Sequence, residues 1–204
     1  MVDFTAQRIQ QFAANVNAAT AAAIAQSLTA HAADYGLTTP LRAAHFMGQM
    51  SHESGGFTHF QENLNYSADR IGQVWPRLKP RAQQLAHNPQ ALGNAAYAGK
   101  LGNGDEASGD GYRFRGRGLV QITGRANYKD MGGKISVDLV ATPDNAADPL
   151  TATLVALAFW NSRGCNAAAD TDSCEAVTRI INGPALAGLA DRQAQTNKAK
   201  TIFV

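Results

Sequence analysis

Two glutamates in the first third of the chain have the residue type and the spacing for acid–base chemistry. Glu53 and Glu62 are nine positions apart. Cleaving a glycosidic bond requires two carboxyl groups with opposite preferences, one that holds a proton and one that is ionised. A connection this short can place both groups across a narrow cleft. The pair therefore indicates hydrolysis with one acid and one base.

Glu53 lies at the end of a predicted helix. Thr39 and Pro40 predict the start of this helix, no breaker follows in residues 41–54, and Gly55-Gly56 predict its end. An apolar stripe at helical spacing continues to Glu53; it consists of Ala43, Phe46, Met47 and Met50. Burial and the negative end of the helix dipole both favour the protonated carboxyl group, which suits a general acid. The alternative is an ordinary Glu that rotates into solvent.

Glu62 follows in a segment whose pattern predicts an extended conformation. Phe60, Leu64 and Tyr66 share one parity, and polar amides occupy the other, at Gln61, Asn63 and Asn65. The amides can donate hydrogen bonds and keep the region wet, which favours an ionised carboxylate that activates water. Taken alone, Glu62 is equally compatible with a solvated loop acid. The interpretation as a base depends on the pair.

Composition predicts one globular domain over residues 1–204. Hydrophobic residues make up 45% of the chain and charged residues 17%, and no apolar run approaches the roughly 18 to 20 residues that span a bilayer. The first residues lack the basic and apolar pattern of a signal peptide. A net charge of +2 is far from that of a dedicated nucleic-acid binder. Cys165 and Cys174 are interpreted as free or weakly structural, although they could close one small loop.

Most of the chain is predicted to be helical, with one long glycine-rich loop. Seven glycines between Gly99 and Gly118 predict that loop, and residues 119–123 then predict a short strand with Gln121 and Thr123 on one face. Two polar side chains there could bind a sugar. The predicted helices cover residues 5–33 as one or two helices, 67–75, 81–98 with a break at Asn88-Pro89, 148–164, 173–183 and 186–200.

Other motifs favour neither a metal nor a nucleotide. His52-Glu53 begins like the H-E-x-x-H zinc motif, but Gly56 occupies the second ligand position, and the loop glycines match no nucleotide or calcium pattern, so no cofactor is expected. Arg113, Arg115 and Arg117 predict one face of a strand, where they pair with acids. The alternative from another class is an RNA-binding or cell-wall-binding protein without catalysis, which would use this arginine strand.

Several blocks in the same order resemble glycoside hydrolase family 19. They span about Thr38 to Arg192; the blocks are His52-Glu-Ser-Gly-Gly-Phe57, Glu62-Asn-Leu-Asn-Tyr-Ser67, residues 109–128 and Ile181-Asn-Gly183. The chain is most similar to the endolysin branch of that family, in which bacteriophage enzymes cut peptidoglycan. The loop between the two glutamates is shorter than in plant chitinases, and their several cysteines are absent.

This resemblance implies a mainly α, two-lobed lysozyme-like fold with a short strand beside the active-site cleft, and inverting hydrolysis. It implies Glu53 as the general acid, Glu62 as the general base and Thr123 as a holder of the attacking water. The sugar-binding positions that it implies are Gln121, Asn127, Asn182 and Arg192. The expected substrate is the β-1,4 bond between N-acetylmuramic acid and N-acetylglucosamine, with chitin as the alternative.

The same resemblance implies how such an enzyme reaches the cell wall. A monomer without stable membrane association would be made in the host cytoplasm and released to the peptidoglycan by a separate holin-type, pore-forming protein. The shorter loop leaves the orientation of Glu62 open, because a short connection can turn its side chain.

Overall fold

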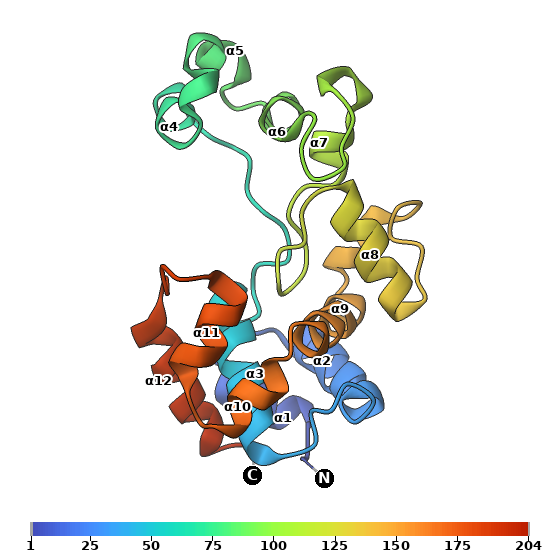
Figure 1. Cartoon of the computed structure of the whole chain (residues 1–204), viewed down its shortest axis with the longest axis vertical. Helices are drawn as coiled ribbons and strands as arrows, with labels where there is room; N and C mark the ends of the chain where they lie inside the picture. The colour runs from blue at the N-terminus through green and yellow to red at the C-terminus, as the bar shows by residue number, and fades with distance from the viewer. Residues whose placement is uncertain (1, 204) are drawn as a thin grey trace. The chain divides into compact units, whose positions relative to one another are not determined.

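The fold of residues 2–203 is described from a computed structural model and is mainly helical, as the sequence predicts (Figure 1). The chain forms two compact units. Unit 1 contains the described residues up to Phe60, Gly118–Val120 and the described residues from Asn145 onward. Unit 2 contains Gln61–Arg117 and Gln121–Asp144. Within residues 2–203, no helix is both long and apolar enough to cross a bilayer.

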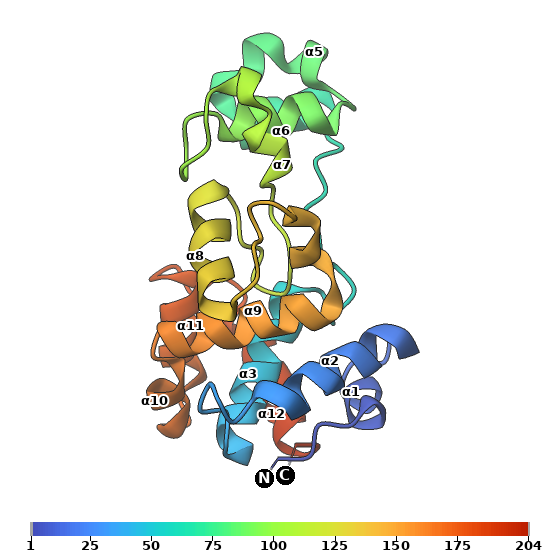
Figure 2. The same ribbon diagram turned by 90° about the vertical axis from the view of Figure 1, so that its right-hand side faces the viewer.

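Unit 1 is built around helix α3. Phe46 of α3 packs edge-on against Trp160 of α9, with ring centroids 5.5 Å apart, and α9 in turn lies beside α2 (Figure 2). The apolar stripe of α3 is fully buried, as predicted. The helices of this unit are α1 (Ala6–Phe12), α2 (Ala18–His31), α3 (Pro40–Glu53), α9 (Pro149–Ser162), α10 (Cys165–Asp170), α11 (Cys174–Asn182) and α12 (Leu189–Lys200).

The ends of α3 follow the local signals in the sequence. The Thr39 side chain accepts a hydrogen bond from the Arg42 backbone N–H at 3.2 Å, and Pro40 occupies the first turn, where a missing N–H costs nothing. At the other end, Gly55 and Gly56 have positive φ angles of 58° and 71°. Because glycine enters this conformation without strain, the helix ends at Glu53 and the chain turns away.

Helices α3 and α12 approach each other closely at Gly48. A Cβ atom placed on Gly48 would lie 2.4 Å from Thr196 Oγ1 and 2.7 Å from the Thr196 backbone N. No side chain fits in that space, so glycine is required for this distance between the helices. The close contact brings residues one turn further along α3 within reach of α12.

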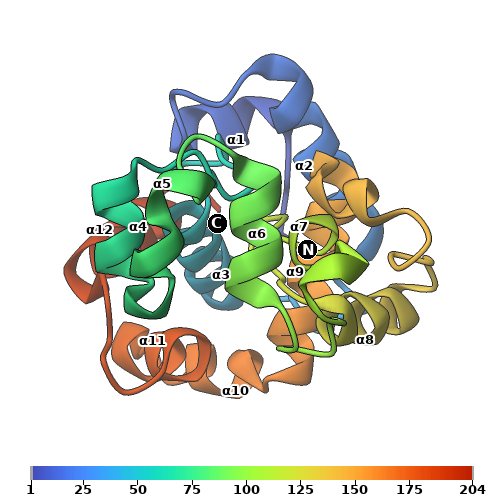
Figure 3. The same ribbon diagram turned by 90° about the horizontal axis from the view of Figure 1, so that it is seen from above.

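Unit 2 is a smaller helical unit with its own core. Leu64, Ile71, Leu85 and Leu92 are among its buried residues, and Figure 3 shows α5 beside both α4 and α6. Its elements are α4 (Ala68–Val74), the 3-10 helix η1 (Pro76–Arg81), α5 (Ala82–Leu85), α6 (Pro89–Tyr97), the 3-10 helix η2 (Glu106–Ser108), α7 (Asp110–Arg113) and α8 (Arg125–Ile135). A third 3-10 helix, η3 (Pro143–Ala147), contains the boundary between the units.

Two strands were predicted, one over residues 119–123 and one carrying Arg113, Arg115 and Arg117, and neither forms. Residues 119–123 form a tight turn, closed by hydrogen bonds between the backbones of Arg117 and Ile122 at 2.9 and 3.1 Å, and Gln121 has a φ of 50°. A positive φ interrupts the alternation on which a strand depends. Among residues 2–203, the only β-type backbone pairing consists of two isolated antiparallel bridges, which join Arg117 to Gln61 and to Ile122.

The three arginines that were expected on one strand face serve different contacts. Arg113 ends helix α7 and donates to the Val140 carbonyl, and Arg115 donates to Gln61 Oε1 at 2.7 Å. Of the three, Arg117 is the one that pairs with an acid among the described residues, with Asp144 at 2.5 Å. Each arginine therefore has a partner within unit 2, which does not favour the RNA-binding alternative.

Candidate active site

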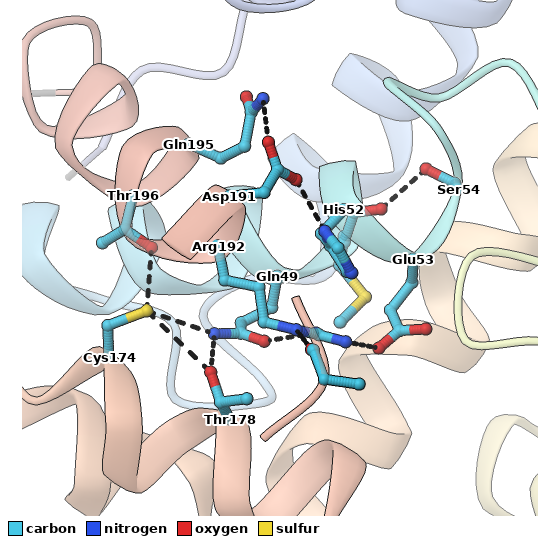
Figure 4. Close-up of polar contacts among 12 residues, drawn as sticks. Gln49, His52, Glu53, Ser54, Cys174, Thr178, Asp191, Arg192, Gln195 and Thr196 are labelled. Carbon is cyan, nitrogen blue, oxygen red and sulfur yellow. Dashed lines mark hydrogen bonds and ion pairs between the residues drawn. The ribbon is translucent and has the colours of Figure 1, made fainter. Parts of the chain in front are cut away.

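Glu53 is the last residue of α3, and its carboxylate contacts a buried cation. Arg192 of α12 donates a hydrogen bond from Nη2 to Glu53 Oε1 at 2.6 Å (Figure 4). The Arg192 side chain is 1% exposed and that of Glu53 is 23% exposed. Glu53 is thus anchored and does not rotate freely into solvent. The sequence analysis expected Arg192 to bind sugar and did not predict this contact with Glu53.

Arg192 is oriented by a turn that also involves Asn182. Its Nε donates to the Ala187 carbonyl at 3.0 Å, and the Ala187 backbone N–H donates to Asn182 Oδ1 at 2.9 Å. The structure therefore brings Asn182, Arg192 and Glu53 together in unit 1. Because Arg192 is buried, its guanidinium is placed to act on Glu53, and the direct sugar contact expected of it has no support from its position.

A second pair joins the same two helices one residue earlier. His52 Nδ1 lies 2.6 Å from Asp191 Oδ2, next to the contact between Glu53 and Arg192. The hydrogen bond from His52 lowers the pKa of Asp191 below its ordinary value. Consecutive residues of α3 are thus tied to consecutive residues of α12, which fixes the helix end that carries Glu53.

Glu62 lies in unit 2, and both of its carboxylate oxygens receive hydrogen bonds. The Tyr97 hydroxyl donates to Oε2 at 2.7 Å, and the Gly116 backbone N–H donates to Oε1 at 3.1 Å. Burial, together with the charge of Glu62, raises the pKa of Tyr97, so this hydroxyl remains a donor. Both carboxylate oxygens of Glu62 therefore act as hydrogen-bond acceptors. The orientation of Glu62 that the sequence left open is therefore toward Tyr97 and Gly116.

The polar residues that follow Glu62 in the predicted site gather around Gly116. A Cβ atom on Gly116 would lie 3.0 Å from Gln121 Oε1, 3.3 Å from Thr123 Oγ1 and 3.4 Å from Glu62 Cβ. Asn127 is exposed on the first turn of α8, and its amide donates to the Thr123 carbonyl at 2.7 Å. The structure thus brings four predicted site residues together in unit 2. The expected distance of about 6.5–9.5 Å between the carboxyl groups of Glu53 and Glu62 stays a prediction.

The structure also describes the state of the two cysteines and tests for a metal site. Both Cys165 and Cys174 are free and buried, as the sequence analysis interpreted them. Burial raises the pKa of the Cys165 thiol to about 12. In the part of the chain that the structure describes, no group of three or more His, Cys, Asp or Glu residues is arranged to hold a metal ion.

Comparison with known proteins decides the family. The family model described as "Chitinase class I" of the Glyco_hydro_19 family matches residues 4–196. The chain belongs to glycoside hydrolase family 19. It is 39% identical over 171 residues to a glycosyl hydrolase family 19 domain-containing protein of Haemophilus influenzae, covering 82% of each chain. Rice Chitinase 8 (Oryza sativa subsp. japonica) is 30% identical over 105 residues, which cover 42% of this chain and 40% of that protein.

Solved structures of family 19 chitinases share the fold. Chitinase C of Streptomyces griseus superposes with a TM-score of 0.65 at 20% identity, covering 98% of this chain and 91% of that one. A class IV chitinase of Zea mays gives a TM-score of 0.55 at 17% identity, covering 99% and 96%. This family 19 protein is therefore a chitinase-like glycosidase that acts on a polysaccharide.

Sequence reasoning missed two residues, one that contacts the predicted base and one that contacts Arg192, the partner of the predicted acid. Tyr97, the partner of Glu62, ends a helix 35 positions further along, and nothing in the local sequence marks it. Gln49 lies four residues before Glu53 and contacts Arg192. A signal for Gln49 existed, because His45, Gln49 and Glu53 repeat every four residues and so share one face of α3.

Proposed function

We propose that this glycosidase hydrolyses the β-1,4 bond between N-acetylmuramic acid and N-acetylglucosamine of bacterial peptidoglycan with inversion. Glu53 is the general acid and Glu62 the general base. The observation that carries this assignment is the difference between their hydrogen bonds. Both oxygens of Glu62 accept hydrogen bonds, whereas Arg192 contacts Oε1 of Glu53 and leaves Oε2 without a bond from the guanidinium.

The proposed reaction uses each of these groups in one step. Glu53 gives its proton to the glycosidic oxygen, and the bond from this oxygen to the anomeric carbon breaks. A water attacks the opposite face of that carbon, and Glu62 accepts its proton. Thr123 helps to hold this water, and Gln121, Asn127 and Asn182 bind sugar hydroxyl or acetamido groups. The product has the inverted anomeric configuration.

Peptidoglycan as the substrate is supported by the short connection between the two glutamates and by the presence of only two cysteines, which are free and buried. These features resemble the endolysin branch. The second candidate is chitin hydrolysis, which is favoured by the chitinases among the relatives and the structural neighbours. The two substrates differ in the lactyl ether and the peptide that only peptidoglycan carries.

Mass spectrometry of purified peptidoglycan after digestion tests the proposed substrate and bond. Fragments with N-acetylmuramic acid at the reducing end support the proposal. N-acetylglucosamine ends, released peptides or anhydro sugars would each exclude it. The same preparation is tested on colloidal chitin, and new reducing ends there, with peptidoglycan intact, would establish the chitinase instead. Fast NMR of the first product separates inversion from retention.

We also propose synthesis in the bacterial cytoplasm and release to the wall by a separate holin-type protein. Expression in bacteria with and without a pore-forming protein tests this route. Lysis only when the pore is present supports it, and lysis without a pore contradicts it. Size-exclusion chromatography with light scattering checks the expected monomer of 21.6 kDa.

A further inference from the structure

Gln49 is a completely buried polar residue one helical turn before Glu53. Its side chain amide is 0% exposed, and a buried amide is costly unless its donors and acceptor are bonded. Its Oε1 accepts from Arg192 Nη1 at 2.6 Å. Its Nε2 donates to Thr178 Oγ1 at 3.0 Å and lies 3.6 Å from Cys174 Sγ (Figure 4). Thr178 and Cys174 of α11 therefore position the Gln49 amide, and the Gln49 amide in turn positions Arg192.

The orientation of this amide is fixed by the chemistry of its neighbours. A guanidinium has only donors, so it must meet the carbonyl oxygen of Gln49. The NH₂ group must then face the hydroxyl of Thr178 and the sulfur of Cys174, and both of these residues are buried. A flipped amide would place donor against donor on the arginine side. Gln49 can hold Arg192 in only one way.

Arg192 is consequently held at each of its three nitrogens. Nε donates to Ala187 O, Nη1 to Gln49 Oε1 and Nη2 to Glu53 Oε1. The first two contacts define the plane of the guanidinium. Arginine and carboxylate often form two parallel hydrogen bonds, which bind both carboxylate oxygens. Here Glu53 receives one, because Nη1 is engaged by Gln49.

We propose that Gln49 is a positioning residue for the general acid. By holding Nη1, it makes Arg192 meet Glu53 through a single donor, so that Oε2 can carry the proton that the reaction transfers. This inference rests on the proposed role of Glu53. Gln49 itself contacts no substrate, and it acts through Arg192.

Two substitutions of similar size at position 49 are expected to act in opposite directions. Gln49→Met removes the acceptor, which frees Nη1 to bind Glu53 as well and favours the ionised carboxylate. Gln49→Glu adds a negative charge that competes for Arg192, which favours protonated Glu53. A nearby charge shifts a carboxyl titration by about one pH unit or more. In the pH profile of kcat, the fall in activity on the alkaline side should therefore move to lower pH in Gln49→Met and to higher pH in Gln49→Glu. KM should change little.

Most other ionisable groups on α10, α11 and α12, which pack against α3, are paired, and their contacts are the same in every variant. Asp191 on α12 contacts His52, Asp170 on α10 contacts Arg42, and Glu175 on α11 contacts Arg179. Further along α3, His45 contacts Asp172, which also pairs with Lys200 of α12. The remaining groups are Cys165 on α10, which is buried, Cys174 on α11, beside Gln49, and Lys198 on α12, which lies over the Phe12 ring.

The experiment measures Glu53 directly as well as catalysis. Carbon-13 NMR follows the carboxyl titrations of Glu-labelled protein, and Glu53→Gln identifies the Glu53 signal by its loss. Gln193→Glu is the matched control, because it places the same charge next to Arg192 in sequence but on the exposed face of α12, where the Gln193 amide donates to Asn197 Oδ1 at 3.2 Å. Thr178→Val loosens Gln49 without altering charge and should shift the midpoint in the direction of Gln49→Met, by less.

Opposite shifts of the Glu53 midpoint in Gln49→Met and Gln49→Glu, with none in Gln193→Glu, support the inference. Shifts in one direction, or equal shifts in the control, overturn it. If Gln49→Met does not fold, an unchanged midpoint in a folded Thr178→Val protein overturns it equally. Failure of the proposed function is distinguishable, because a wild-type protein that cuts neither peptidoglycan nor chitin leaves the NMR midpoints measurable.

Discussion

The Tyr97 hydroxyl donates to Glu62 Oε2 at 2.7 Å, which ties the end of α6 to the proposed base. Tyr97→Phe removes this donor and leaves the ring in place. A hydrogen bond to a charged group contributes about 1.5–3 kcal/mol, and of its two hydrogen bonds described above Glu62 would keep the one from the Gly116 N–H. We expect kcat to fall by roughly 10- to 100-fold, since about 1.4 kcal/mol corresponds to a factor of ten, with a small change in KM, measured as new reducing ends.

Tyr112→Phe serves as the control for this variant. Tyr112 also lies in unit 2, and its ring stacks under the Arg115 guanidinium at 4.3 Å, a contact that phenylalanine preserves. Equal loss of activity in both variants would show that Tyr97 has no special role in supporting Glu62.

Glu53→Gln and Glu62→Gln should each be severe. Loss of a positioned acid or base reduces kcat by about 100- to 10,000-fold. Glu62→Gln can retain more activity, because bulk water can accept a proton. Both proteins should keep the helical circular dichroism of the wild type. Glu175→Gln, at an exposed ion pair on α11, is the control with the same chemical change. Substantial lysis by Glu53→Gln would reject its assignment as the acid.

Gly48→Ala tests whether the close contact of α3 and α12 is needed. The added Cβ would meet the Thr196 backbone N at 2.7 Å, so the helices must separate. Overpacking of this kind costs about 1–3 kcal/mol. We expect a lower free energy of unfolding in urea, together with a loss of activity in the protein that remains folded, because separation of the helices breaks the contact between Glu53 and Arg192. Undiminished activity and stability would contradict this account.

Local signals predicted most of the longer helices, because each depends on residues close together in the sequence, but they did not predict α8. Thr39, Ser67, Asp148 and Ser173 cap helices where the sequence placed them. The extended segment at Glu62 also has the predicted alternation, with Leu64 buried and Asn63 and Asn65 exposed. These features need no knowledge of the rest of the fold.

The environments of the two glutamates could not be predicted in the same way. Arg192 reaches Glu53 from 139 positions away, and Tyr97 reaches Glu62 from 35 positions away. Spacing along α3 indicated that Glu53 faces the interior, but it did not indicate that the Arg192 guanidinium lies beside it. The strand prediction failed for a related reason, since the apolar and polar alternation of residues 119–123 contains no sign of the positive φ at Gln121.

Gly116→Ala should disturb the residues around the proposed base with little effect on stability. Its Cβ would approach Gln121 Oε1 at 3.0 Å and Thr123 Oγ1 at 3.3 Å, so both side chains must shift by a few tenths of an ångström. Since positioning of the water and the sugar depends on them, we expect a several-fold to roughly tenfold loss in kcat/KM.

Gly133→Ala is the control for this glycine substitution. It lies within α8, and among the described residues no atom beyond its chain neighbours and the backbone of its own helix lies within 4 Å of the Cβ it would gain. Alanine there should stabilise the helix by up to about 1 kcal/mol and leave activity unchanged. If Gly116→Ala is as active as Gly133→Ala, then Gln121 and Thr123 do not need their observed positions.

The stability of the protein should decrease below neutral pH because of His45. Its ring is 0% exposed, and burial lowers its pKa below the ordinary value, although its contact with Asp172 at 2.9 Å opposes this. The unfolded chain therefore binds a proton below about pH 6.5, where the folded chain still does not. The free energy of unfolding should then fall as pH drops below that value, by at most about 1.4 kcal/mol per pH unit for this one group.

His45→Gln removes this titratable group and should make the free energy of unfolding depend less on pH. Urea unfolding from pH 7.5 to 5 gives the difference in stability between the wild type and the variant, and this difference should shrink toward low pH. His31→Gln, at a side chain 39% exposed on α2, is the control and should leave the slope in place. A difference that grows toward low pH would mean that His45 is charged in the folded protein, with Asp172 outweighing burial.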